Sequence, residues 1–188
     1  KVLAVGKYAM MMHGKTPDNI RTVRPMKDGV IADFQATESL MRELIKKIPA
    51  PKSVFPPALK MVICIPSGIT EVEERAVRDS AEQAGAREVR LIHEPMAAAI
   101  GIGLNVLEPH GNMVVDIGGG TSEIAVIALG GIVSNKSIRI AGDDFNQDIK
   151  EYMRKRHNIS IGDYTSERIK IEVGAALPEL DTPPEDFA

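Results

Sequence analysis

The sequence predicts an α/β fold in which a glycine-rich loop closes a β-hairpin. Apolar residues fill 113–117 and lead into the loop, and an alternating apolar pattern follows from Glu123 to Leu129. A second observation is the strand, helix, strand succession over residues 61–92, which is typical of parallel strands. A glycine-rich loop that opened a helix would instead favour a P-loop or dinucleotide-binding fold.

The first strong helix signal follows Thr37, which we predict to be the N-cap. Several proline residues between positions 49 and 57 then break regular structure. The apolar face of this helix consists of Leu40, Met41, Leu44, Ile45 and Ile48.

Residues 61–65 predict a buried strand that Pro66 ends. Cys64 lies in this apolar run, and we interpret it as a buried strand residue in preference to a nucleophile. Because it is the single cysteine, no disulfide forms within the chain.

The next helix begins with a capping-box pattern, Thr70 and Glu73, and reaches Ala84, with Gly85 suited to its C-terminal end. Residues 89–92 predict the following strand. The three elements form a β-α-β unit, so we expect parallel strands and a right-handed crossover.

An alanine-rich helix follows, because Pro95 suits a first helical turn. Past the hairpin, a turn at Gly130 and Gly131 leads to a predicted strand over residues 132–140. Further helices are expected at 144–156 and 165–177. The acidic, proline-containing residues 178–188 predict a mobile loop or frayed end.

The hairpin loop runs from Asp116 through Gly118, Gly119 and Gly120 to Thr121. Three glycines let the backbone approach a ligand with amide groups turned toward a phosphate. The Asp116 carboxylate suits a hydrated Mg²⁺ ion. The alternative is an ordinary hairpin turn with an aspartate at its edge, although consecutive glycines lose much backbone entropy on folding.

Composition excludes some classes of function. Aromatic residues make up 4% of the chain and the formal net charge is −3, so neither a basic excess nor an aromatic platform indicates nucleic-acid binding. The histidines are scattered without zinc spacing. No segment approaches the roughly 20 apolar residues of a transmembrane helix, and no signal peptide is visible.

The hairpin resembles the second phosphate loop of the superfamily of actins, sugar kinases and heat-shock chaperones. An ordered set of stretches resembles the MreB family of bacterial actin homologues over nearly all of residues 1–177. These stretches are residues 14–17, 24–33, 94–101, 112–123, 138–143 and 167–170.

This resemblance implies an actin-like ATPase domain with the ribonuclease-H-like fold. It implies a protein that binds Mg·ATP, hydrolyses ATP, forms protofilaments under the cytoplasmic membrane and works with cell-wall synthesis and shape-determining proteins to maintain rod shape. The implied division is 1–31 for part of the small subdomain of lobe one, 32–110 for the core and hinge helix of lobe one, 111–143 for the hairpin of lobe two, and 144–188 for part of the small subdomain of lobe two.

The resemblance also implies roles for single residues. Glu94 and Thr121 position the water that attacks the γ-phosphate, and His93 stands where a glutamate is expected. The hairpin residues Asp116, Gly118, Gly119, Gly120 and Thr121 contact phosphates, Asp116 through magnesium and its water. The nucleoside segment is Glu167, Arg168, Ile169 and Lys170.

Simpler roles remain open for two of these features and for one further candidate. Glu94 suits the dipole of a helix N-terminus, and Glu167 and Lys170 are spaced as a solvated helical pair. Val54 and Phe55 lie in a proline-rich loop and are candidate membrane contacts, with nearby lysines attracted to anionic lipid; alternatively, Phe55 folds back onto the core.

Only one phosphate hairpin occurs here, so we expect the first hairpin upstream of Lys1, the adenosine loop beyond Ala188, and an incomplete, inactive ATP site in these 188 residues alone. Two rivals share the superfamily. A sugar kinase needs a sugar pocket with a catalytic carboxylate, and a chaperone ATPase needs a downstream peptide-binding domain.

Overall fold

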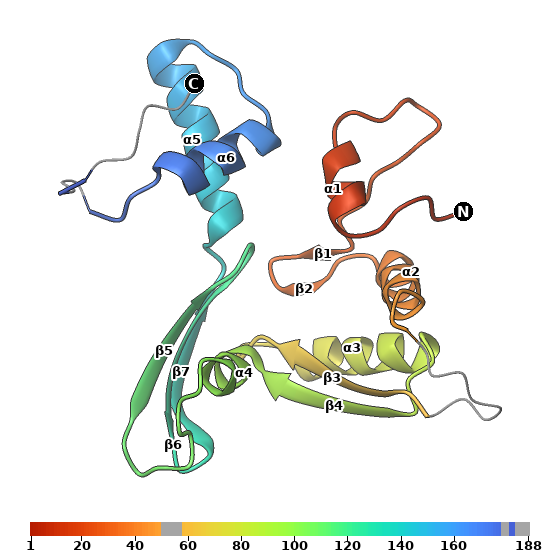
Figure 1. Cartoon of the computed structure of the whole chain (residues 1–188), viewed down its shortest axis with the longest axis vertical. Helices are drawn as coiled ribbons and strands as arrows, with labels where there is room; N and C mark the ends of the chain where they lie inside the picture. The colour runs from red at the N-terminus through yellow and green to blue at the C-terminus, as the bar shows by residue number, and fades with distance from the viewer. Residues whose placement is uncertain (50–57, 178–180, 183–188) are drawn as a thin grey trace. The chain divides into compact units, whose positions relative to one another are not determined.

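The structure is a computed structural model that describes residues 1–49, 58–177 and 181–182. Its chain forms two compact units. Unit 1 consists of Lys1–Asp116 and Glu123–Ser137, and unit 2 of Ile117–Ser122 and Ile138–Ala188. Helices and strands are mixed along the chain (Figure 1), which confirms the predicted α/β class. The four-part division into subdomains stays a prediction.

Two predictions concern residues that lie partly or wholly outside these described ranges. Val54 and Phe55, the candidate membrane contacts, lie outside the described residues, as does most of the tail at 178–188. Within the described part of the chain, no helix combines the length and the apolar character that crossing a bilayer requires.

The N-terminal part of unit 1 contains the short helix α1 (Lys7–Met12) and a small hairpin. Strands β1 (Met26–Lys27) and β2 (Val30–Ile31) pair antiparallel. Asp28 and Gly29 join them with φ of 50° and 78°. Positive φ at both central residues is the geometry that an Asp-Gly hairpin turn supplies.

Helix α2 (Phe34–Ile45) begins earlier than the sequence predicted. Asp33 is its N-cap, and Asp33 Oδ1 accepts a hydrogen bond from Ala36 N at 2.9 Å. The prediction of Thr37 as the cap was therefore wrong. Asp33, four positions earlier, takes the cap position, so Thr37 lies inside the helix. Thr37 is buried there, and its hydroxyl donates to Asp33 O at 2.8 Å.

The β-α-β unit forms as predicted. Strands β3 (Lys60–Ile65) and β4 (Glu88–His93) pair in parallel, with Met61 opposite Val89 and Ile65 opposite His93. Helix α3 (Glu71–Gln83) connects them and begins with the Thr70–Glu73 capping box. The glycine after it, Gly85, has φ of 110°, a conformation that glycine adopts without strain.

Cys64 is exposed, so the prediction that it is buried was wrong. Burial alternates along β3: Met61 and Ile63 are half-buried and Ile65 is fully buried, whereas Lys60, Val62 and Cys64 are exposed. The apolar run suggested burial on both faces, but successive side chains point to opposite faces of the sheet. In the described structure only one of those faces is covered.

Strands β5 (Asn112–Ile117), β6 (Ser122–Ala128) and β7 (Gly131–Ile138) form one sheet in that order. The turn between β6 and β7 is made by Leu129 and Gly130, both at positive φ, one residue earlier than predicted. Helix α4 (Glu94–Gly101) packs its small Ala99 against Val114, Ala125 and Ile127, which are all buried. This cluster is one apolar core within unit 1.

Unit 2 carries the two remaining helices, α5 (Gly142–His157) and α6 (Asp163–Val173), which pack against each other. Helix α5 ends at Asn158, whose φ of 55° is left-handed, and basic residues fill its last turn. Both features are typical of helix C-termini. The predicted ranges of 144–156 and 165–177 locate both helices, although α6 ends four residues earlier.

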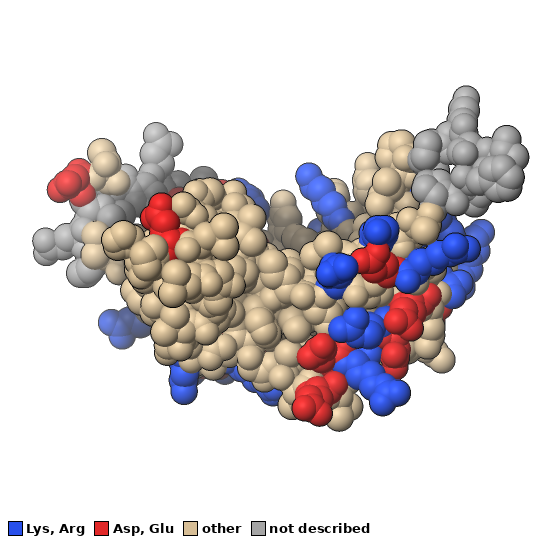
Figure 2. Space-filling model, turned by 90° about the horizontal axis from the view of Figure 1, so that it is seen from below, with Lys and Arg blue, Asp and Glu red and all other residues tan. Residues whose placement is uncertain are grey.

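Figure 2 shows Lys and Arg side chains intermixed with Asp and Glu side chains over part of one face, whereas much of the rest of that face is uncharged. Glu88 pairs with Lys60 at 2.7 Å and with Arg90 at 3.0 Å, and these contacts lower the pKa of Glu88. Because such exposed pairs are solvated, they contribute little to stability.

Candidate functional site

The glycine-rich loop joins β5 to β6, as the sequence predicted. Gly118 N donates to Thr121 O at 2.9 Å and closes the turn. None of the three loop glycines has positive φ, so their value here is small size. A Cβ on Gly118 would stand 3.2 Å from the Thr121 carbonyl oxygen, tighter than ordinary van der Waals contact.

The backbone of this loop is bonded to the N-terminus of α5. Gly142 N donates to Gly118 O at 3.1 Å, and Asp143 N donates to Gly119 O at 2.8 Å. In a trans peptide the carbonyl and the following N–H point in opposite directions. The N–H groups of Gly119 and Gly120 therefore point away from α5, and successive amides of this kind can form an anion-binding concavity.

Gly142 occupies the tightest point of this junction. A Cβ there would meet Lys170 Nζ at 3.1 Å and Gly118 O at 3.2 Å. The lysine can move, but the hairpin carbonyl cannot move without breaking its hydrogen bond. Gly142 belongs to the stretch 138–143 that resembles the MreB family, but the sequence alone did not predict a role for it.

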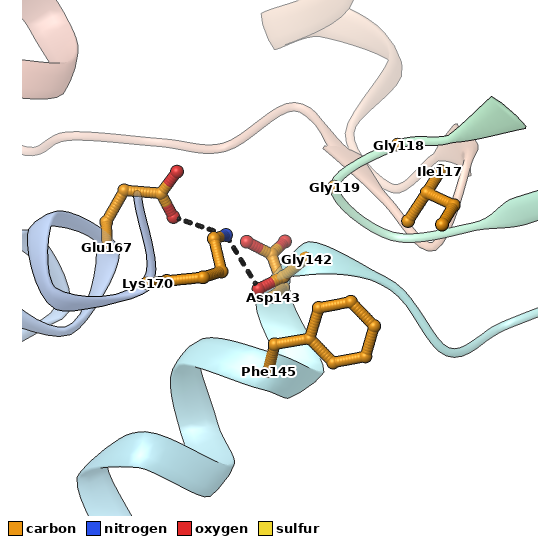
Figure 3. Close-up of a pocket in the computed structure, with 8 residues that line it drawn as sticks. All are labelled: Ile117, Gly118, Gly119, Gly142, Asp143, Phe145, Glu167 and Lys170. Carbon is orange, nitrogen blue, oxygen red and sulfur yellow. Dashed lines mark hydrogen bonds and ion pairs between the residues drawn. The ribbon is translucent and has the colours of Figure 1, made fainter. Parts of the chain in front are cut away.

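A cavity of about 430 Å³ opens beside the junction, entirely within unit 2. We call it the α5–α6 pocket, and Figure 3 shows its lining side chains. Phe145 presents its ring on one side, and Lys170 lies between Glu167 and the start of α5. The lining residues are Ile117, Gly118, Gly119, Gly142, Asp143, Phe145, Glu167 and Lys170.

Glu167 and Lys170 form an ion pair in this pocket. Lys170 Nζ donates to Glu167 Oε2 at 2.8 Å and to Gly142 O at 3.1 Å. The pair is the helical contact that their spacing allowed, but it also faces the hairpin junction. The pocket thus combines an ammonium group, a carboxylate, an aromatic ring and a glycine-rich backbone.

Buried Asn146 does not line the pocket but contacts Glu167, which does, and sequence reasoning missed it. It is 8% exposed, and its Nδ2 donates to Glu167 Oε2 at 2.5 Å. Its position within the charged helix α5 carries no signal that distinguishes it from a surface asparagine. Only the packing of α5 against α6 reveals the contact.

Other predicted residues lie elsewhere. Arg168 points to Glu172, with bonds of 2.9 and 3.2 Å, and neither Arg168 nor Ile169 lines the pocket. Thr121 is buried at the end of the hairpin, and Gly120 is half-buried beside it. His93 is exposed and precedes α4.

Apart from the pocket of unit 2, unit 1 contains a group of three acidic residues, which we call the carboxylate cluster: Glu94, Asp116 and Glu123. Burial raises the pKa of Glu94, and the charges of Glu123 and Asp116 raise it further. Glu94 is the first residue of α4, where the helix dipole favours a negative charge. The raised pKa shows that the surroundings disfavour that charge on balance.

Glu123 is the most enclosed member of the cluster, at 1% exposure. Its carboxylate accepts hydrogen bonds from Ser67 N at 3.0 Å and from Ser137 Oγ at 2.5 Å. These bonds tie the turn after β3 to strands β6 and β7. Sequence reasoning gave Glu123 no role, because its alternating strand pattern does not distinguish a buried carboxylate from an exposed one.

Glu94 belongs to unit 1 and Thr121 to unit 2, so their joint role stays a prediction. In the described residues no group of three or more His, Cys, Asp or Glu side chains is arranged to hold a metal ion. A hydrated Mg²⁺ needs fewer protein ligands, since waters and phosphate oxygens fill its shell. Asp116, half-buried near the end of β5, stays the predicted contact.

The sequence matches the MreB/Mbl protein family over residues 1–185. It is 54% identical over 177 residues to the cell shape-determining protein MreB of Escherichia coli, covering 94% of this chain and 51% of that protein. The chain therefore spans about half the length of the curated relatives it matches.

Solved structures agree with the sequence match. The crystal structure of MreB5 of Spiroplasma citri bound to ADP superimposes with a TM-score of 0.86 at 38% identity, over 95% of this chain and 53% of that one. The same protein bound to AMPPNP gives a TM-score of 0.86 at 38% identity over 96% and 54%. These matches confirm the predicted actin-like fold.

Proposed function

The chain belongs to the MreB/Mbl family, and on that premise we propose that the protein binds Mg·ATP, hydrolyses it and assembles into filaments. We further propose that the filaments lie on the inner face of the cytoplasmic membrane. There they organise cell-wall synthesis with shape-determining partner proteins and maintain rod shape.

The observation that supports nucleotide binding most strongly is the junction between the hairpin and α5. The hairpin carbonyls are occupied by Gly142 N and Asp143 N, which leaves the Gly119 and Gly120 amides facing the other way. Amides of successive glycines form an anion-binding concavity. The crystal structures of MreB5 of Spiroplasma citri contain ADP and AMPPNP, which carry the phosphates such a concavity suits.

The remaining parts of the pocket fit the nucleoside. Its volume lies within the range of small-molecule sites. Phe145 offers an apolar surface for a base or sugar, Lys170 offers a cation, and the Glu167 carboxylate accepts hydrogen bonds from ribose hydroxyl groups. Arg168 and Ile169 complete the proposed nucleoside segment, and Asp116 is assigned to hydrated magnesium.

In the proposed chemistry the protein positions the attacking water and forms no covalent intermediate. When bound, Mg·ATP supplies the phosphorus atom that water attacks. Glu94 accepts a hydrogen bond from the attacking water and Thr121 orients it. The raised pKa of Glu94 makes this carboxylate a better proton acceptor than an ordinary glutamate.

Larger-scale assignments follow from the family alone. We assign residues 1–31 and 32–110 to the small subdomain and core of lobe one, and 111–143 and 144–188 to the hairpin and small subdomain of lobe two. Val54 and Phe55 are the proposed membrane contacts.

The proposal is tested by negative-stain microscopy of the full gene product with Mg·ATP, with and without anionic vesicles. We expect nucleotide-dependent filaments on the vesicles, and filaments that persist longer in a Glu94→Ala variant because hydrolysis is slowed. A protein that stays monomeric under all these conditions contradicts the proposal. Sugar-stimulated turnover would then favour a kinase, and peptide-stimulated turnover a chaperone.

A further inference from the structure

The Glu167 carboxylate is held by donors from two different helices. Asn146 of α5 donates to Oε2 at 2.5 Å, and Lys170 of α6 donates to the same oxygen at 2.8 Å. Lys170 sits three residues from Glu167 on the same helix, α6, and reaches α5 only through its separate bond to Gly142 O at 3.1 Å. Asn146 contacts the carboxylate directly from α5.

The orientation relative to α5 matters because α5 also fixes the hairpin. Its first two residues, Gly142 and Asp143, donate to the Gly118 and Gly119 carbonyls. Asn146 lies about one helical turn further along the same helix. One rigid element therefore sets the separation between the carboxylate and the glycine amides.

The two polar atoms of the Asn146 side chain differ: Nδ2 donates a hydrogen bond to Glu167, whereas Oδ1 accepts none from the described residues. The residue is 8% exposed, and its Oδ1 has no hydrogen-bond partner among the described atoms. A buried acceptor without a partner is unfavourable, and an apolar residue of similar shape would avoid it. The hydrogen bond from Nδ2 to Glu167 offsets the free-energy cost of burying the Oδ1 atom without a partner.

We propose that Asn146 is a positioning residue that holds Glu167 to accept a ribose hydroxyl and so makes the pocket select ribonucleotides over deoxyribonucleotides. This inference rests on the proposed nucleotide binding and deepens it. A site built to hydrogen-bond a hydroxyl rejects the analogue that lacks it, because the half-buried carboxylate loses a donor. The preference for ribonucleotides should be lost when the Glu167 carboxylate is no longer held in position by Asn146.

The test uses the full gene product and titrates Mg·ATP, Mg·2′-deoxy-ATP and Mg·3′-deoxy-ATP. The variant is Asn146→Asp, which keeps the size of the side chain but removes its N–H donor. Gln147→Glu is the matched control, since it makes the same amide-to-carboxylate change at the next, exposed position.

We expect the wild-type protein to prefer ATP over at least one deoxy analogue by roughly tenfold or more. Asn146→Asp should lose most of this preference, and Gln147→Glu should keep it. A uniform loss of affinity with the preference intact overturns the inference, because it shows that Asn146 only stabilises the helix pair. A wild-type protein that binds all three nucleotides equally overturns it while leaving nucleotide binding intact.

A wild-type protein that binds none of them contradicts the proposed function itself, and the inference with it. Should Asn146→Asp fail to fold, the wild-type protein labelled with ¹⁵N-asparagine answers the question. The side-chain amide signal of Asn146 should move on addition of ATP and move less with the discriminated deoxy analogue. Equal movement with all three nucleotides overturns the inference.

Discussion

The carboxylate cluster of unit 1 and the α5–α6 pocket of unit 2 treat negative charge in opposite ways. In the pocket, the Glu167 carboxylate receives an amide donor and a lysine ammonium group. In the cluster, Glu94 faces the charges of Glu123 and Asp116. The donors to Glu123 are neutral, a backbone amide and a serine hydroxyl.

This difference suits the two groups of residues to different roles. Paired charges fix a side chain in one geometry, as recognition of a ligand requires. Like charges gathered in a partly buried site oppose folding and raise the affinity for a proton, as catalytic groups often do. This contrast supports the proposed roles, in which the pocket of unit 2 binds the nucleotide and the cluster of unit 1 contributes to the chemistry.

Removing the carboxylate of Glu94 gives the largest expected effect. In the full gene product, Glu94→Gln should lower the rate of phosphate release from Mg·ATP by about 100-fold or more, the range for a group that manages a proton. Nucleotide affinity should stay close to the wild-type value. The control is His93→Gln at the exposed neighbouring position, and an unchanged rate in Glu94→Gln contradicts the assignment of chemistry to the cluster.

Glu123 tests whether the cluster is also a structural centre. Glu123→Ala leaves Ser67 N and Ser137 Oγ without their buried acceptor, which should lower the free energy of unfolding by about 2 kcal/mol or more. Urea denaturation measures this. The matched control is Glu43→Ala, which removes only the exposed ion pair to Lys46 and should cost well under 1 kcal/mol. Equal losses in both variants would sink the idea.

Gly142 tests the rigidity of the pocket. Gly142→Ala places a methyl group against the Gly118 carbonyl and should destabilise the protein by about 1–3 kcal/mol, with weaker nucleotide binding. Gly101→Ala is the control, since a Cβ at that glycine meets no atom within 4 Å. Thermal melts of both variants measure the effect, and a Gly142→Ala protein as stable as the control would contradict a tight junction.

The smallest expected effect is the dependence of stability on pH. Because the pKa of Glu94 is raised in the folded state, the folded protein holds this proton more tightly than the unfolded chain. Stability should therefore fall as pH rises through the interval between the ordinary and the raised pKa.

Glu94→Gln should accordingly be more stable than the wild type at about pH 8, with the advantage fading toward about pH 4. Urea denaturation across this range measures the difference. A variant that is less stable than the wild type at about pH 8 shows that Glu94 stabilises the fold, as an ordinary helix N-terminal carboxylate does.

Local signals located most elements because their causes are local. The Thr70–Glu73 capping box lies within one turn of α3 and was read correctly. Thr37 was misread because Asp33 competes for the same role. Cys64 was misread because an apolar run does not show which face of a sheet is covered.

The candidate site was only half visible in the sequence. The hairpin could be predicted because its glycines are adjacent, and Glu167 and Lys170 could be predicted from a family resemblance. Glu123 and Asn146 depend on contacts with residues 14 to 56 positions away. No periodicity or spacing records contacts of that kind.

The most direct test of the central claim follows the hairpin amides in the full gene product, labelled with ¹⁵N-glycine. Titration with Mg·ATP should move the amide signals of Gly119 and Gly120 most. Gly118, whose N–H is bonded to Thr121, should move less. Saturating nucleotide that moves none of these hairpin signals would show that the phosphates bind elsewhere, and would contradict the account.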